Sequence, residues 1–158
     1  MGTRFILDYS KAKELLPKRP IEGNKGTFGR ALIIAGSRKM VGCCELAVSG
    51  AFRCGVGLVT LAFPDCIYDT VTLRLTENTF MPLPSHNGEL SKECLTELLN
   101  EVNNFDVVVF GCGLGRNCDI KEILGELILK SQKPLIIDAD GLNALAEGVE
   151  VLKNAECD

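Results

Sequence analysis

The sequence has no tryptophan, one histidine and no C-x-x-C pair, although it contains eight cysteines. Zinc sites usually combine closely paired cysteines with histidines, so a structural zinc centre is not indicated. A disulfide framework is typical of small secreted domains, whereas 46% of this sequence is hydrophobic, enough to form a core. We therefore expect free thiols that pack as small apolar groups. His86 is expected at the surface.

The sequence also lacks long apolar runs and an excess of positive charge. No apolar stretch approaches the roughly 18 residues that span a bilayer, and the N-terminus has no signal-peptide apolar region. The formal net charge is −4, without a basic stripe. We therefore expect neither nucleic acid nor a membrane as a partner, and we expect a cytoplasmic protein. The length of 158 residues suits a single domain.

Short apolar runs alternate with helical patterns along the chain. The predicted strands are 31–35, 57–63, 107–110 and 134–138, and the predicted helices are 42–54, 91–102, 119–130 and 142–147. Alternation of this kind favours an α/β fold with a mostly parallel sheet in three α/β/α layers.

Some local features of these elements can also be predicted. Ser91 and Asp119 are the expected N-caps of their helices. Helix 42–54 is expected to pack one face against the sheet, consisting of Leu46, Ala47, Gly50, Ala51 and Cys54. Pro82 and Pro84 predict a loop at 81–90.

Ligands of parallel α/β sheets bind outside the carboxyl ends of the strands. Two glycine-rich turns occupy such positions, AGSRKMVG (35–42) and GCGLGRN (111–117). The second is G-x-G-x-G, which misses the dinucleotide fingerprint by one residue, and neither is a Walker A loop. Each turn could bring the backbone close to a phosphate or carbonyl group, or could serve only as a tight turn.

The stretch DADGLN (138–143) also follows a predicted strand. Asp138 and Asp140 could hold Mg²⁺ through water or orient a hydroxyl group, and Asn143 lies on the next helical turn. Alternatively, Asp140 is only an N-cap. Before the first strand, Lys25 and Arg30 could meet phosphate or could simply be solvated.

Taken together and in this order, the motifs resemble those of the ADP/ATP-dependent NAD(P)H-hydrate dehydratases, members of the ribokinase-like superfamily. The similarity extends from about residue 10 to residue 147. The motifs that carry it are KGTFGR (25–30), AGS (35–37), GVGLVT (55–60), TENTFMPLP (76–84), GCGLG (111–115) and DADGLN (138–143). The resemblance implies that residues 1–158 are the N-terminal portion of a single ribokinase-like domain.

The resemblance implies a cofactor-repair activity. Enzymes of this family remove water from (S)-NADHX or (S)-NADPHX at the expense of ADP or ATP, with Mg²⁺. Hydroxide is a poor leaving group, so phosphorylation of the hydroxyl lowers the barrier, and the protein positions the reactants.

Individual site residues follow from the same resemblance. The hydrate-binding position falls at Cys43, where the family usually has alanine. The substrate-contacting glycine is Gly113, and Cys112 stands where a proline is usual. Asp138, Asp140 and Asn143 match the family motif. From their positions around the first predicted strand, and not from the resemblance, Lys25, Gly36 and Ser37 are expected to bind the nucleotide. No residue is expected to be a direct metal ligand.

The family's T-P-H-P-G-E and N-x-G-T-G-D stretches do not occur in this sequence. The general base is thus expected beyond residue 158, no catalytic residue is assigned, and we expect the isolated chain to be inactive. An incomplete sheet would expose an edge and apolar faces, which favours a homo-oligomer. The alternatives are a small-molecule kinase of the same superfamily, acting on a hydroxymethyl group or sugar, and a non-catalytic nucleotide-binding remnant.

Overall fold

The computed structural model of the chain describes residues 8–16, 18–146 and 148–155. Five strands form a sheet in the order β3-β2-β1-β6-β7. All neighbouring pairs in it are parallel. The strands are β1 (Arg30–Ile34), β2 (Leu58–Pro64), β3 (Thr79–Leu83), β6 (Val107–Phe110) and β7 (Leu135–Ile137). The predicted parallel α/β sheet is confirmed.

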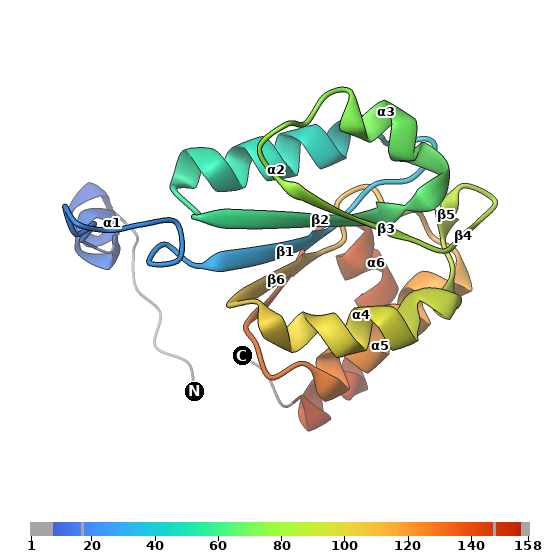
Figure 1. Cartoon of the computed structure of the whole chain (residues 1–158). Coiled ribbons are helices and arrows are strands. Elements are labelled where there is room, and N and C mark those ends of the chain that lie inside the picture. Colours follow the sequence, from blue (N-terminus) through green and yellow to red (C-terminus); the bar gives the residue numbers. More distant parts are fainter. Residues whose placement is uncertain (1–7, 17, 147, 156–158) are drawn as a thin grey trace.

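Helices cover both faces of this sheet (Figure 1). On one face lie α2 (Gly42–Cys54), the short 3₁₀ helix η1 (Asp65–Ile67) and α3 (Tyr68–Thr72). On the other face lie α4 (Leu95–Glu101) and α5 (Cys118–Lys130), with η2 (Lys92–Cys94) and η3 (Val102–Asn104) at the two ends of α4. The three-layer α/β/α arrangement is therefore also confirmed.

Strand β1 shows why the apolar runs are nearly continuous. Leu32 and Ile34 belong to the buried cluster that packs against α4 and α5, whereas Ile33 belongs to the cluster beneath α2. Successive side chains of a strand point to opposite faces, so a strand covered on both sides needs apolar residues at every position.

Strand β3 lies inside the segment where prolines predict a loop. Pro82 pairs in register with Phe63 of β2. Because β3 is at the end of the sheet, one of its edges is unpaired, and a proline without an N–H group is tolerated there. The rest of the predicted loop includes a small hairpin of β4 (Ser85–His86) and β5 (Glu89–Leu90). The loop prediction for 81–90 is wrong over most of its length.

Helix α2 packs a different face than the sequence predicts. Its buried residues are Cys44 and Val48, four positions apart on one face. Leu46 is 76% exposed, and Cys54 is exposed as well. Gly50 is exposed too. The prediction is wrong for these three residues, while Ala47 and Ala51 do pack against the core cluster.

One of the two predicted N-cap residues is confirmed. Ser91 caps η2, because its Oγ accepts a hydrogen bond from the backbone N–H of Glu93. Helix α5 is capped by Asn117 instead of Asp119, and its side chain accepts from the N–H of Ile120 at 3.0 Å. Asp119 is in the first turn, where a negative charge still complements the helix dipole.

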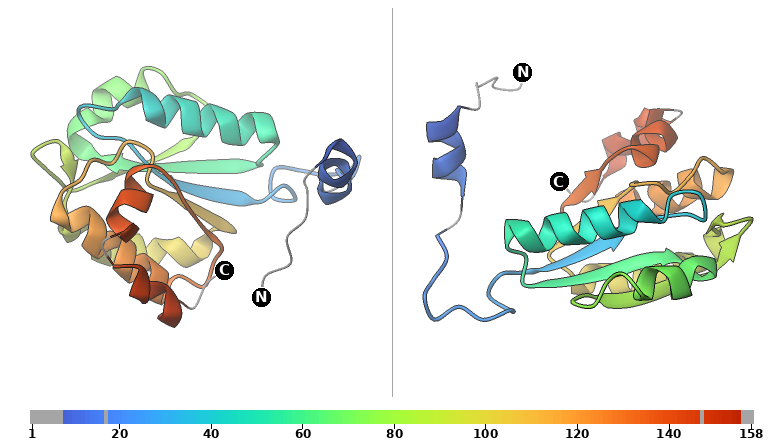
Figure 2. Two further views of the ribbon diagram at one scale, coloured as in Figure 1. Left: turned by 180° about the vertical axis from the view of Figure 1, so that it is seen from behind. Right: turned by 90° about the horizontal axis from the view of Figure 1, so that it is seen from above.

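Three elements lie at the ends of the chain. Helix α1 (Tyr9–Leu15) has no buried residue and stands apart from the sheet in both views of Figure 2. Helix α6 (Asp140–Ala146) follows β7, and η4 (Val149–Asn154) packs against α5. The predicted helix 142–147 thus begins earlier, and Glu147 lies outside the described residues.

The last strand of the sheet is β7, and within the described residues it pairs with β6 alone. The side chain of Ile136 at its centre is 53% exposed. This agrees with the expected apolar exposure at the open edge. Within the described parts of the chain, no helix is long and apolar enough to cross a bilayer.

The buried cluster beneath α5 yields a stability prediction. Leu127 of α5 is completely buried, so Leu127→Ala should lower the free energy of unfolding by about 2–5 kcal/mol through lost burial and a residual cavity. Leu73→Ala removes a side chain of the same size that is 85% exposed and should change stability little. Urea denaturation of both variants makes the comparison, and equal losses would contradict the packing described.

Candidate functional site at the carboxyl ends of the strands

The turns that follow β1, β6 and β7 meet at one edge of the sheet. The N–H of Gly111 donates to the carbonyl oxygen of Ile34 at 3.2 Å, and the N–H of Asp138 donates to that of Phe110 at 3.0 Å. These hydrogen bonds carry the strand pairing into the turns themselves. The predicted meeting of the three motifs at the carboxyl edge is therefore observed.

Gly111 is the point where two of these turns touch. Its φ is +131°, a region that disfavours L side chains, and a Cβ atom there would collide with the carbonyl oxygen of Asp138. The same oxygen accepts from the N–H of Gly141 at 2.9 Å. Only glycine at position 111 lets the β6 and β7 turns approach backbone to backbone.

The first cluster of predicted site residues joins Gly36, Cys43 and Gly113. The N–H of Gly36 donates to the Cys112 carbonyl oxygen at 2.9 Å, and the Cys43 thiol donates to the same oxygen at 3.0 Å. Gly113 has φ +67°, and a Cβ atom there would overlap Cys43 Sγ. Ser37, next to Gly36, is buried with 2% exposure.

The second cluster centres on Asp140, the first residue of α6. Its carboxylate accepts from the N–H of Gly115 at 3.1 Å and from Asn143 Nδ2 at 3.2 Å. Arg116 Nε lies 3.6 Å from Asp140 Oδ1, but the Arg116 side chain is 76% exposed, so this ion pair contributes little. Asp140 therefore ties the turn after β6 to the start of α6.

The two aspartates of the DADGLN motif have different partners. Asp138 is exposed, and its Oδ2 lies 3.8 Å from Cys112 Sγ, whereas Asp140 faces the backbone of Gly115. No group of three or more His, Cys, Asp or Glu side chains among the described residues is arranged to hold a metal ion.

An open cavity of about 550 Å³ lies beside Asp140. One wall is the start of α5 and the other is α6, so the cavity opens at the carboxyl edge. Its lining residues are Arg116, Asn117, Cys118, Lys121, Asp140, Asn143, Ala144 and Ala146. Three of these residues, Arg116, Asn117 and Lys121, are not among the site residues predicted from the sequence. Arg116 and Asn117 belong to the GCGLGRN turn, so their place after a predicted strand could have identified them as site residues.

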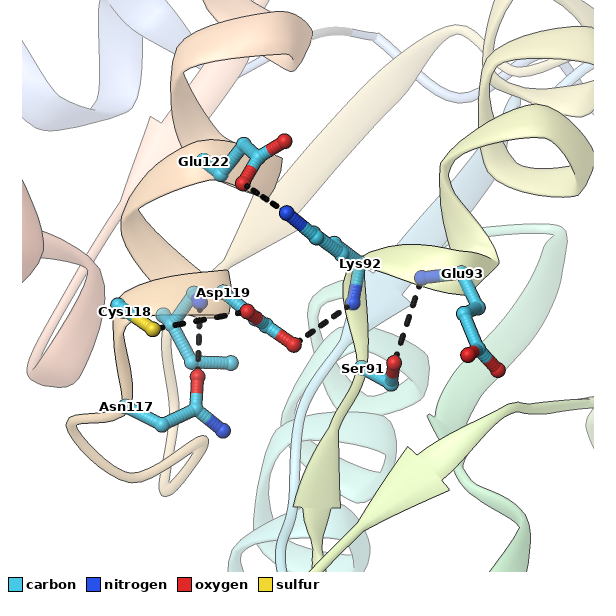
Figure 3. Close-up of polar contacts among 8 residues, drawn as sticks. Ser91, Lys92, Glu93, Asn117, Cys118, Asp119 and Glu122 are labelled. Atoms are coloured by element: carbon cyan, nitrogen blue, oxygen red, sulfur yellow. Dashed lines mark hydrogen bonds and ion pairs between the residues drawn. The ribbon is translucent and has the colours of Figure 1, made fainter.

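The first turn of α5 is bound by the segment that follows the β4–β5 hairpin (Figure 3). The backbone N–H of Lys92 donates to Asp119 Oδ2 at 3.1 Å, and Lys92 Nζ lies 3.2 Å from Glu122 Oε2. The carboxylate of Glu89 accepts from the N–H of Asn117 at 3.2 Å. The hairpin and η2 thereby fix the loop that lines the cavity.

Lys25 is not part of either cluster. Its carbonyl lies against Gly57, and the Gly57 N–H donates to Phe28, just before β1 and β2 begin. This is the amino edge of the sheet, opposite the turns that hold Gly36 and Gly113. Lys25 is an expected nucleotide-binding residue, and β1 separates it from the other two, Gly36 and Ser37, which follow that strand.

The cysteines in the described ranges are free, as predicted, and three of them lie near the site. A hydrogen bond with the Cys44 thiol is the main cause that lowers the pKa of Cys43. The same hydrogen bond, together with burial, raises the pKa of Cys44. Burial, followed by the charge of Asp138, raises the pKa of Cys112. Cys157 lies outside the described residues.

Comparison with known proteins decides the family. Residues 31–157, which include both clusters, match the family model described as NAD(P)H-hydrate dehydratase. The chain belongs to the NAD(P)H-hydrate dehydratase family. The family resemblance predicted from motif order is confirmed.

Curated relatives agree with this assignment. The bifunctional NAD(P)H-hydrate repair enzyme of Moorella thermoacetica is 37% identical over 150 residues, which is 94% of this chain and 28% of the relative. The ADP-dependent (S)-NAD(P)H-hydrate dehydratase of Listeria monocytogenes is 31% identical over 135 residues, 84% of this chain and 46% of the relative. The chain spans less than half the length of these relatives.

Solved structures support the same fold. A ribokinase-like protein of Enterococcus faecalis superposes with a TM-score of 0.75 at 23% identity, covering 94% of this chain and 52% of the other. The Bacillus subtilis ADP/ATP-dependent NAD(P)H-hydrate dehydratase, co-crystallised with ATP/Mg²⁺, superposes with a TM-score of 0.65 at 25% identity. It is covered over 45% of its length. The ribokinase-like fold is confirmed.

The contact at Gly111 gives a pair of opposite predictions. Gly111→Ala should destabilise the chain by about 1–3 kcal/mol, because its methyl group collides with the Asp138 carbonyl at an unfavourable φ. Gly125→Ala lies within α5, where a Cβ atom meets nothing within 4 Å. It should stabilise the chain by about 0.5–1 kcal/mol. Thermal and urea unfolding measure both, and a neutral Gly111→Ala would refute the close approach.

Proposed function

We propose that this chain contributes the substrate-binding wall of an enzyme that dehydrates (S)-NADHX or (S)-NADPHX, driven by ADP or ATP. The observation that supports this most is the cluster of Gly36, Cys43 and Gly113, because it lies within the matched stretch and at the carboxyl edge of the sheet. The Moorella and Listeria relatives carry repair and dehydratase names. These names favour dehydration over a sugar or hydroxymethyl kinase and over a non-catalytic remnant.

The local geometry suits recognition of a large polar cofactor. The cavity of about 550 Å³ beside the turn after β6 offers Arg116 and Asn143 as polar contacts. Asp140 holds Gly115 and Asn143 in fixed positions. Groups that are already ordered lose little entropy when ligand binds.

In the proposed reaction the substrate hydroxyl takes a phosphoryl group from ADP or ATP and then leaves as phosphate. The carbon–carbon double bond of the reduced nicotinamide forms as a proton is lost. The described residues would orient the substrate through the turns that hold Gly36 and Gly113, and through the hydrogen bonds of Asp140 to Gly115 and Asn143. Gly36 and Ser37 remain the proposed nucleotide contacts, whereas the position of Lys25 at the opposite edge does not support that role. Mg²⁺, when bound, would neutralise negative charge on the phosphoryl group that is transferred.

Two further predictions accompany this proposal. A homo-oligomer is expected because β7 leaves an open edge with Ile136 half exposed. A cytoplasmic location is expected from the sequence and from the metabolite-repair role of the relatives. Residues 1–158 remain proposed as the N-terminal portion of one ribokinase-like domain.

A chimera tests the proposed function. Residues 31–157 replace the matching segment of the Listeria monocytogenes enzyme, and conversion of NADHX is followed by the absorbance of NADH. The chimera should convert the hydrate only when ADP or ATP is supplied. Gly113→Val in the chimera should slow conversion roughly 10- to 100-fold, because its side chain displaces Cys43 and obstructs the turn.

Gly125→Ala in the same chimera is the matched control and should retain the parent rate, since position 125 is on α5 away from the turn. A chimera that melts cooperatively but shows no conversion, or conversion without nucleotide, would contradict the proposed function. Equal rates for the Gly113→Val and Gly125→Ala chimeras would remove Gly113 from the site.

A further inference from the structure

A groove lies between α4 and the strands β2 and β3, and none of the predicted site residues lines it. Two adjoining cavities of about 430 and 370 Å³ form this groove, and both are lined by Thr60 and Glu101. The strands form its floor and α4 forms one wall, in the arrangement that Figure 1 shows for these elements. This surface is the α4 groove.

The α4 groove combines apolar and acidic groups. Leu58 of β2 and Met81 of β3 are half-buried in its floor. Glu97 and Glu101 are exposed on its wall, one helical turn apart on the same face of α4. Arg30 lines only the part of the groove at the amino edge. The groove therefore suits a partner that has an apolar stripe with positive charges beside it.

Helix α1 has this complementary pattern. Successive residues of a helix are about 100° apart, so Tyr9, Ala12 and Leu15 share one side of α1. Lys11 and Lys13 lie at the two borders of that side. No residue of α1 is buried, and the Tyr9 side chain is 83% exposed. The described part of the chain thus leaves exposed an apolar stripe that lysines flank.

Charge and length both fit between α1 and the α4 groove. The two lysines of α1 would lie beside Glu97 and Glu101. Lys11 already forms an ion pair with Glu14 at 3.1 Å, but both side chains are largely exposed, so that pair contributes little and can be exchanged. The seven residues of α1 span about 10 Å, which equals the length of the seven residues of α4.

Arg19 restrains the chain between α1 and β1. Its Nη1 donates to the carbonyl oxygen of Gly55 at 2.8 Å, and its guanidinium lies 3.7 Å from the centre of the Phe28 ring. Gly55 is the C-cap of α2, which covers the face of the sheet opposite α4. The four chain steps from Leu15 to Arg19 reach at most about 14 Å. This short tether on the α2 side, and the position of α1 away from the sheet in Figure 2, favour the α4 groove of a second copy over that of the same chain.

We propose that α1 of one copy binds in the α4 groove of a second copy, and that the second copy makes the same contact in return. Two equal contacts of this kind close a symmetric dimer. Pro82 of β3 has no N–H group, so this edge of the sheet pairs poorly with an added strand, which favours a helix as the occupant. The two surfaces include neither the predicted site residues nor β7. The inference therefore depends neither on the proposed dehydration nor on association through the β7 edge.

Photo-cross-linking of the whole chain tests which copy binds α1. Tyr9 is replaced by the photoreactive amino acid benzoylphenylalanine, and equal amounts of unlabelled and ¹⁵N-labelled chain are mixed, irradiated and digested with trypsin. Peptide 5–11, which carries position 9, should be joined to peptide 75–92 or 93–116, which contribute to the groove. Pairs of one labelled and one unlabelled peptide should be as frequent as uniformly labelled pairs, because only contacts between copies produce mixed pairs.

Two results of this experiment would overturn the proposal. Uniformly labelled pairs alone would place α1 in the groove of its own chain. Cross-links of peptide 5–11 mainly to peptide 131–153, which holds β7, would place α1 at another surface.

Charge reversal separates this interface from other modes of association. Sedimentation velocity should show the parent chain as a dimer, and Glu97→Lys with Glu101→Lys should weaken the dimer roughly tenfold or more, because like charges then face each other. Adding Lys11→Glu and Lys13→Glu to that variant reverses both sides and should restore the dimer, which loss of folding would not allow.

Glu45→Lys with Asp69→Lys is the matched control. It makes the same change of charge on α2 and α3, which cover the opposite face of the sheet, and should leave the dimer unchanged. A monomeric parent, a dimer that Glu97→Lys with Glu101→Lys leaves intact, or a failure of the four substitutions together to restore it would overturn the proposal.

Discussion

The backbone contact between Gly111 and the carbonyl oxygen of Asp138 is the constraint on which the carboxyl edge of the sheet depends. A side chain at position 111 would fill the space where that oxygen lies. Because the contact is made by backbone, it fixes the turns after β6 and β7 in one relative position. Gly113 follows Gly111 by two residues and Asp140 follows Asp138 by two residues, so this contact also determines where Gly113 and Asp140 lie.

The carboxyl edge is supported by three segments: α2, the start of α6 and the β4–β5 hairpin. On the α2 side, Cys43 rests against the turn through the Cys112 carbonyl. On the α5 side, Asp140 holds the Gly115 N–H, and Glu89 of the hairpin holds the Asn117 N–H. The turn between β6 and α5 is thus held by three separate segments of the chain, which explains how a glycine-rich stretch can be an ordered surface for a ligand.

The sequence predicts the fold well where burial alone decides the pattern. The continuous apolar run from Leu32 to Ile34 predicts a strand that is covered on both faces. Several such runs together predict the three layers. Sequence-based prediction fails where contacts with other segments determine the local structure. Pro82 is tolerated in β3 because β3 is at the end of the sheet. Asn117 caps α5 in place of Asp119, because Glu89 of the hairpin holds the loop before the helix. Motif order brought Gly36, Cys43, Gly113 and Asp140 to one edge correctly. Lys25 precedes β1 in the sequence and so lies at the amino edge of the sheet, and its role as a nucleotide contact stays a prediction.

The central claim is that the carboxyl edge, and not the amino edge, binds the hydrated cofactor. Amide chemical shifts of the 158-residue chain, titrated with (S)-NADPHX, test it most directly. The account predicts shift changes concentrated at Gly36, Gly113, Gly115 and Asp140, with Gly57 unaffected. Changes centred on Gly57 and the residues before β1, or none at saturating ligand, would contradict it.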